Sequence, residues 1–422
     1  MRKVFISICI GLAIFICDFG SVYAINAGSE LVRTRSRNER ETHVQSENSL
    51  KAGLPAAVRS VLAPDAIWKI GAFLPLSGPY AGIGLRFKRG LELALAAEKT
   101  AVYSWQIDYI DSAEIYPAAA LADFKSRGVD IVLGPIQSAL ARSVVQAATS
   151  LELPLILLAP QPELAQAGSG VFQHFFNAAD EAREIVRLLH QFKQTRVALL
   201  CPENSFGKLF SQIFSKACLT QKIAIWKSLS YDPAVVDFSL VIKGLRQPQT
   251  GSNCDRNKKG DVIPNYPFSA LVIADFWPRL RLIVPQLAFF GVEEPQLYAT
   301  SRGSELNFFK ASEGKLEGII FIDSSFHSPQ PSRLVESYKN SYFKVYREPA
   351  SIYDAYAYDT VQLLAEARES MVRGAGVDLA GSLLKLPALE LVTGTTAVTD
   401  TGVFAKQLCP VTYKSGKLLQ VH

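Results

Sequence analysis

The stretch WKIGAFLPLSGPYAGIGLRFKRGLELALAA, residues 68–97, decides the fold class. The apolar run Ile67–Leu74 has the length of a strand, and a loop rich in Gly and Pro follows it. From Gly84 to Ala97, leucine and alanine recur at a spacing that lets one helical face pack on a sheet. We therefore predict a strand, a loop and a helix.

The same unit recurs along the chain. Further strands are predicted at Trp105–Ile110, Asp130–Leu133, Leu155–Leu158, Arg196–Leu200, Lys222–Leu229, Ala270–Ala274, Leu297–Thr300 and Gly318–Ile322. Helices are predicted at Tyr116–Lys125, Leu140–Ser150, Gly207–Thr220, Val235–Arg246, Leu280–Phe290, Arg333–Tyr346, Ala355–Ser370 and Leu379–Leu386. Such alternation predicts an α/β fold with parallel sheets flanked by helices. The tail Thr393–Leu419 is predicted to be a hairpin.

Residues 1–24 have the pattern of a secretory signal: a charged start, an apolar run from Val4 to Cys17, and small residues up to Ala24. We expect cleavage after Ala24 and a periplasmic or secreted mature protein. The apolar run is shorter than the ~20 residues that span a bilayer. Lipid anchoring at Cys17 is disfavoured, because Phe15 and Ile16 are bulkier than a lipoprotein peptidase accepts.

Two polar segments interrupt the pattern. Residues 25–64 crowd charges of both signs without an apolar period, which predicts a disordered linker, with a basic docking tail as the alternative. Residues 247–267 are predicted to be an inserted loop whose Arg256, Lys258 and Lys259 form either a contact patch or a solvated excursion.

Net charge and cysteines exclude some partners. Removing Arg2, Lys3 and Asp18 with the signal lowers the formal charge from +5 to +4, which is too small to indicate nucleic acid or an acidic membrane. The remaining cysteines have no CxxC or other metal-like spacing, so no metal site is predicted. Export permits disulfides, and the pairing stays open among Cys201, Cys218, Cys254 and Cys409.

Motifs for catalysis are missing from the sequence. It contains no GxSxG, no HExxH and no glycine loop ending in Lys-Ser/Thr. Its five histidines are far apart in the sequence: His43, His174, His190, His327 and His422. We therefore predict a protein that is not an enzyme and carries no cofactor.

The loop Ser77–Gly84 resembles a phosphate cradle but has neither the lysine nor the glycine spacing of a nucleotide site. It does join the carboxyl end of a strand to the start of a helix. Open α/β sheets bind their ligands at that edge. The loop is therefore a candidate for one side of a ligand site.

Several segments resemble type I periplasmic binding proteins of the branched-chain amino acid kind. These are Ile70–Tyr80 (IGAFLPLSGPY), Val132–Pro135 (VLGP), Leu153–Ile156 (LPLI), Arg196–Leu200 (RVALL) with Phe206-Gly207, and Tyr353–Asp359 (YDAYAYD). The resemblance covers nearly all of residues 67–422. It implies two Rossmann-like lobes joined by three crossovers, one of residues 67–176 and 326–387 and the other of 177–325 and 388–422. The ligand would bind in a cleft between the lobes.

The resemblance also supplies site residues. Ser138 matches a position whose hydroxyl meets an amino acid carboxylate, and Phe206 matches an aromatic wall, although a cap or core role would explain either. Two departures concern the ligand. The usual Ser or Thr is missing from residues 158–162 (LAPQP), which include Gln161, and Arg302 stands near the usual acid, where a cation would repel an ammonium. The predicted ligand-binding set is Ser77, Tyr80, Ser138, Gln161, Phe206, Phe276, Trp277 and Arg302.

The predicted function follows from that set. We expect an extracytoplasmic solute-binding protein that captures a small polar ligand, an amino acid or a related carboxylate or amide, for the membrane permease of an ABC importer. The alternative is a regulator of cell-wall synthesis, similar to activators of penicillin-binding proteins, which would use the same fold to dock a protein.

Overall fold

The first half of the chain forms a parallel sheet, sheet A. The computed structural model describes residues 67–98, 104–246, 266–301, 316–373 and 378–422. Sheet A has the strand order β2-β1-β3-β4-β5, and all its neighbours run parallel. The strands are β1 (Ile67–Leu74), β2 (Ser104–Asp111), β3 (Ile131–Leu133), β4 (Leu155–Leu157) and β5 (Val171–Gln173).

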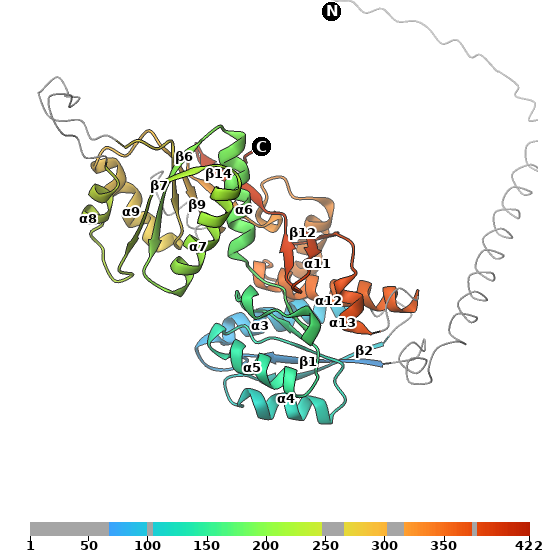
Figure 1. Ribbon diagram of the computed structural model, residues 1–422. Coiled ribbons are helices and arrows are strands. Elements are labelled where there is room, and N and C mark those ends of the chain that lie inside the picture. Colours follow the sequence, from blue (N-terminus) through green and yellow to red (C-terminus); the bar gives the residue numbers. More distant parts are fainter. Residues whose placement is uncertain (1–66, 99–103, 247–265, 302–315, 374–377) are drawn as a thin grey trace, which may run out of the picture. The chain divides into compact units, whose positions relative to one another are not determined.

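Helices cover both faces of sheet A (Figure 1). On one face, Phe124 and Val144 from two helices join Val132 and Leu155 of the sheet in a single buried cluster. On the other face, α3 packs against a helix from late in the chain, α12. The four helices are α3 (Ala81–Glu98), α4 (Pro117–Ser126), α5 (Ser138–Ser150) and α12 (Ile352–Val372).

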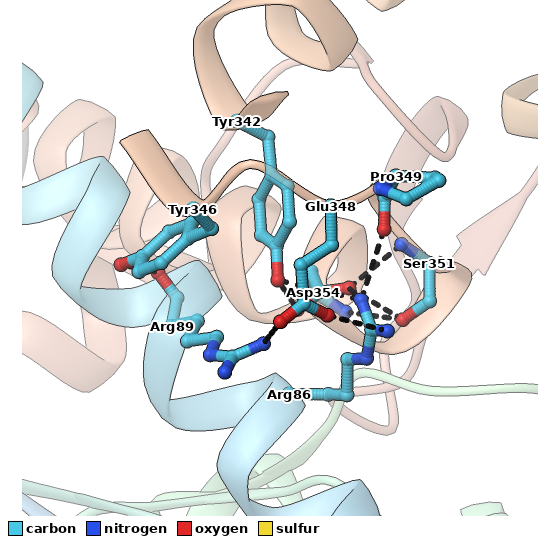
Figure 2. A network of polar contacts seen from close by, with 8 residues as sticks. All are labelled: Arg86, Arg89, Tyr342, Tyr346, Glu348, Pro349, Ser351 and Asp354. Atoms are coloured by element: carbon cyan, nitrogen blue, oxygen red, sulfur yellow. Dashed lines mark hydrogen bonds and ion pairs between the residues drawn. The ribbon is translucent and has the colours of Figure 1, made fainter. Parts of the chain in front are cut away.

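Charged side chains fasten α3 to the start of α12 (Figure 2). Arg86 of α3 donates to Asp354 at 3.3 Å and to Glu348 at 3.1 Å. Asp354 also closes a capping box with Ser351, the residue that precedes α12. The two helices approach so closely here that a Cβ on Gly90 would lie 2.1 Å from the Asp354 carbonyl oxygen.

The second sheet, sheet B, has the strand order β15-β14-β10-β9-β8-β6-β7. Its strands from β7 to β10 are parallel, whereas β14 and β15 pair antiparallel at one edge. The strands are β6 (Arg196–Pro202), β7 (Ala224–Tyr231), β8 (Ala270–Ile273), β9 (Gln296–Ala299), β10 (Ile320–Asp323), β14 (Cys409–Lys414) and β15 (Lys417–Gln420).

Alternation along β6 shows how sheet B is covered on two faces. Val197 and Leu199 pack in a cluster with α6 and α7, while Ala198 and Leu200 pack in a cluster with α8 and α9. Because successive strand residues point to opposite faces, a fully apolar strand indicates burial on both. The helices are α6 (Ala178–Gln191), α7 (Ser205–Thr220), α8 (Ser239–Gly244) and α9 (Trp277–Phe289).

Three connections join the sheets. The first runs from β5 to α6, and the second runs from β10 to α11 (Arg333–Tyr346), which precedes α12. The third follows α13 (Leu379–Leu384) and contains a small antiparallel sheet before the chain returns to β14. That small sheet consists of β11 (Leu389–Leu391), β12 (Gly394–Val398) and β13 (Phe404–Lys406).

The structure confirms the predicted α/β fold, and β1 and α11 have the predicted bounds. The tail is only partly a hairpin, because β14 pairs with β15 whereas residues 394–406 belong to the small sheet. Helix α8 is shorter than predicted, and α6 was not predicted. The lobe boundaries at residues 176, 326 and 387 fall inside the three connections and stay a prediction. The predicted signal and linker, and residues 247–265 of the predicted insert, lie outside the described residues.

Cys201, Cys218 and Cys409 are buried free thiols, while Cys254 lies outside the described residues. Burial raises the pKa of Cys218 to about 12. Among the helices that the structure describes, none is long and apolar enough to cross a membrane.

Candidate functional site

Three predicted site residues gather at one edge of sheet A. Ser77 follows β1, Ser138 follows β3 and begins α5, and Gln161 follows β4. Because β1, β3 and β4 are parallel neighbours, their carboxyl ends meet at the same edge. This is the edge where open α/β sheets bind ligands.

Asp111, at the end of β2, holds the loop that contains Ser77. Its carboxylate accepts hydrogen bonds from Leu76 N and Ala113 N, each at 2.9 Å. Partial burial opposes its ionisation, but these bonds and those from Ser77 outweigh it and lower the Asp111 pKa. Asp111 was not predicted, although an acid at the carboxyl end of a strand was a visible signal.

A side-chain hydrogen bond also joins the loop after β2 to the loop that precedes α5. Ser112 donates its hydroxyl to Gln137 Oε1 at 3.0 Å, and Gln137 directly precedes α5. Ser138 and Tyr80 are exposed at this edge, with Tyr80 55% accessible. Tyr80 and Ser138 are therefore open to a ligand, whereas Ser77 is half-buried and bonds Asp111.

Gln161 differs from these three because part of its carboxamide is buried. Its Oε1 atom is inaccessible to solvent and has no hydrogen-bond partner in the protein. The residue immediately precedes the short helix η2 (Pro162–Leu164), and its backbone N–H bonds to Ala159 O at 2.8 Å. Gln161 thus holds a buried, unsatisfied acceptor at the edge of sheet A, which a ligand would reach only after a local rearrangement.

The predicted aromatic residues lie at the carboxyl edge of sheet B. Phe206 is half-buried in the first turn of α7, which follows β6 and is capped by Asn204. Phe276 follows β8 directly before α9 and is 49% accessible. Trp277 begins α9, whereas Arg302 lies outside the described residues. Since β6 and β8 are adjacent, Phe206 and Phe276 share one edge.

Buried acids at the same edge of sheet B were not predicted. Asp275 follows β8 and accepts from the Tyr231 hydroxyl at 2.7 Å. Glu181 of α6 accepts from Ser301 N at 3.0 Å. Both carboxylates are almost inaccessible to solvent. The position of Asp275 directly after an apolar strand could have flagged it, but α6 itself was missed and Glu181 with it.

Asp323 ends β10 at this edge and is 2% exposed. Its Oδ1 accepts from Ser324 N at 2.6 Å and lies 3.0 Å from His327 Nδ1. Its Oδ2 is buried and has no hydrogen-bond partner in the protein. Within the described ranges, no group of three or more His, Cys, Asp or Glu side chains is arranged to hold a metal ion.

The two α/β sheets carry polar and aromatic residues at their carboxyl edges, where open α/β sheets bind ligands. The periplasmic binding protein family model matches residues 67–415. The chain therefore belongs to the periplasmic binding protein family, a solute-binding family, as its sequence resemblance implied.

Solved structures agree with this fold. A protein from Rhodospirillum rubrum, assigned to a branched-chain amino acid ABC transporter, is 18% identical with a TM-score of 0.71, over 84% of this chain and 100% of that one. The substrate-binding protein LivJ from Streptococcus pneumoniae, in complex with isoleucine, is 21% identical with a TM-score of 0.59, over 84% and 99%. The comparison with curated proteins gave no match.

A structure outside transport is also similar. The LpoA C-domain from Haemophilus influenzae, a regulator of PBP1A, is 16% identical with a TM-score of 0.59, over 84% of this chain and 100% of that domain. At such identities the likeness shows the fold alone. The same fold thus serves both an importer component and a regulator.

Proposed function

We propose that this chain is an extracytoplasmic solute-binding protein that captures a small polar ligand, an amino acid or a related carboxylate or amide, without catalysis. The ligand would bind between two lobes, one built on each sheet, and lobe closure would couple binding to a change of shape. Its partner would be the permease of an ABC importer. The signal at residues 1–24 would direct it out of the cytoplasm.

The unsatisfied Gln161 Oε1 carries this proposal. A buried acceptor without a partner costs about 1–3 kcal/mol, and a donor from a ligand would recover that energy. Structural residues normally satisfy such atoms within the protein. Ser138, which is exposed, and Ser77, which is half-buried at the same edge, would add hydroxyls, and Tyr80 would add an accessible ring.

On the sheet B side, Phe206, Phe276 and Trp277 would form the apolar wall. Arg302, which lies outside the described residues, would hold an anionic group of the ligand. The buried Asp275 and Asp323 would favour a ligand that also carries hydrogen-bond donors. A zwitterion or an amide-bearing carboxylate satisfies both demands.

A thermal-shift screen tests the proposal, because a ligand that binds only the folded state raises the midpoint by mass action. The probes are L-leucine, L-glutamine, L-glutamate, benzoate and acetamide. We expect at least one carboxylate with an N–H donor to raise the midpoint. Without a shift for any polar solute in a wider metabolite screen, the transport proposal fails.

Gln161→Leu then tests the site. The substitution removes the acceptor, so the Kd of the best probe should rise at least tenfold, about 1.4 kcal/mol, in isothermal titration calorimetry. Gln146→Leu is the matched control, because Gln146 lies exposed on α5. Equal affinities in the two variants would place the ligand elsewhere.

The regulator alternative keeps one specific support, the full-length match to the LpoA C-domain. It predicts that the purified chain binds a class A penicillin-binding protein and no small solute. Size-exclusion chromatography with such an enzyme from the same cell distinguishes the two functions. Co-elution that Gln161→Leu leaves unchanged, together with a flat solute screen, would favour the regulator.

A further inference from the structure

The three connections between the sheets are bonded to one another. In the first, Gln173 N donates to Gly402 O of the third connection at 3.0 Å. In the second, the Ser324 hydroxyl donates to Thr393 O at 2.7 Å. The small sheet β11–β13 is therefore the part of the chain on which the connections meet.

Lys406, the last residue of β13, is buried in this junction with 2% exposure. Its Nζ donates to Thr396 Oγ1 at 2.7 Å and lies 5.1 Å from the ring centroid of Tyr356. Its backbone N–H donates to Asp180 Oδ2 of α6 at 2.9 Å. One residue thus links the third connection to the helix that ends the first.

Asp359 of α12 attracts the Lys406 ammonium more strongly than Asp180 does. It is fully buried and accepts from Val392 N at 2.9 Å and Thr393 N at 2.8 Å, in the turn between β11 and β12. Other titratable or charged groups around Lys406 and Tyr356 come from α6, β10 and the first connection: Asp180, Glu181, Arg183, Asp323 and His174.

His174 does not compete with Lys406 for a proton. Thr360 donates its hydroxyl to Tyr356 O at 2.7 Å, so its oxygen accepts from His174 Nδ1, 2.8 Å away. Nε2 is left buried without a partner, and burial followed by the charge of Lys406 lowers the His174 pKa far below its usual value. The imidazole is therefore neutral.

Burial makes the ammonium of Lys406 unfavourable. Desolvation lowers the Lys406 pKa to about 8, and attraction to Asp359 and Asp180 only partly opposes this. A cavity of about 650 Å³ lies beside the junction, and Lys406 belongs to its wall. The wall also contains the titratable or charged side chains Arg183, Glu184, Arg187 and His422. An arrangement of the junction that admitted water would stabilise the charged form.

We propose that Lys406 is a proton-dependent lock of the junction. The neutral amine favours the arrangement described here, which we call closed because Lys406 is buried in it. The ammonium favours a hydrated arrangement, in which water reaches Lys406. The direction of the pH effect follows from the linkage between proton binding and closure. A lysine with a lower pKa in the closed than in the hydrated arrangement binds fewer protons when closed, so closure strengthens as pH rises. The pH dependence is strongest between the Lys406 pKa of the closed arrangement, about 8, and the ordinary lysine pKa of 10.5.

Hydrogen–deuterium exchange of the full mature chain tests this. After correction for intrinsic exchange rates, protection of the amides of Val392, Thr393 and Lys406 should increase about tenfold from pH 7 to pH 9. Amides in the middle of β1 should change little. In Lys406→Met the increase should vanish, while Lys414→Met, at an exposed position on β14, should behave like the unmodified chain.

If Lys406→Met does not fold, Thr396→Val provides the second test. It removes the oxygen that receives the Nζ hydrogen bond, so the midpoint of the protection change should move to lower pH. Protection that is independent of pH in the unmodified chain would overturn the proposal. So would an increase that survives in Lys406→Met or a midpoint that Thr396→Val leaves unmoved.

Discussion

Replacing Asp354 by Ala should destabilise the protein by about 2–5 kcal/mol. The carboxylate caps α12 by accepting from Ser351 N at 2.7 Å, and losing such a cap costs about 1 kcal/mol. It also accepts from the Tyr342 hydroxyl at 2.7 Å. Tyr342 is fully buried, so its hydroxyl proton would lose its acceptor at a cost of about 1–3 kcal/mol, although Arg86 still donates to its oxygen at 3.5 Å. Figure 2 shows these contacts of Asp354.

The ion pair with Arg86 contributes little to this total. The Arg86 side chain is 29% exposed and keeps its bonds to Glu348 and to Pro349 O after the substitution. Partial solvation of this kind limits the loss to about 0–1 kcal/mol. The main cost therefore comes from the cap and from the stranded hydroxyl.

Urea unfolding followed by circular dichroism measures the effect, with an unchanged m-value as the check that the denatured state is the same. The double variant Asp354→Ala/Tyr342→Phe should recover about 1–2 kcal/mol, because it removes the unpaired hydroxyl. Glu348→Gln, at a 39% exposed side chain, is the control and should cost less than 1 kcal/mol. A cost below 1 kcal/mol for Asp354→Ala, or strict additivity in the double variant, would refute this account.

Three further predictions concern packing and burial. Gly90→Ala should cost more than 2 kcal/mol in the same urea assay, because the added methyl meets the backbone of α12. Gly82→Ala is the control and should be neutral or stabilising, because the space around Gly82 is open. Equal effects of the two substitutions would contradict the close approach of α3 to α12. Arg368→Met should cost about 2–4 kcal/mol, since the buried guanidinium lies 4.9 Å from the ring of Trp68 in β1 and 5.2 Å from that of Trp105 in β2. An unchanged urea midpoint would count against this cation–π contribution. In a Cys254→Ser variant of the mature chain, Ellman's reagent should react slowly with the native protein and promptly after denaturation, and fast native labelling would show that some of these thiols are accessible: Cys201, Cys218 and Cys409.

Most of the fold could be predicted because apolar strands alternate with helical spacing throughout the chain. Helix α6 was the main omission, although Asn177 caps it, Asp180 and Glu181 lie in its first turn, and Ile185 and Leu189 keep its apolar spacing. The preceding strand β5 has only three residues, too few to show a period. With no strand recognised before it, the helix had no place in the pattern.

The site was predictable only as far as sequence order places residues. Ser77, Ser138 and Gln161 each follow a strand, so their common edge could be inferred once the strands were parallel neighbours. Whether a side chain finds a partner depends on tertiary contacts. The buried Gln161 Oε1 and the acids Asp275 and Asp323 therefore emerged only from the structure.

The motif Tyr353–Asp359 shows why a family resemblance can be strong while the ligand stays open. Its two aspartates hold the fold together. Asp354 closes the capping box of α12 and binds Arg86, and Asp359 holds the turn between β11 and β12 through Val392 and Thr393. These positions preserve the joint between helices and connections whatever the ligand is. The ligand instead depends on loops such as that of Gln161, where one exchanged side chain alters the hydrogen bonds on offer without disturbing the fold.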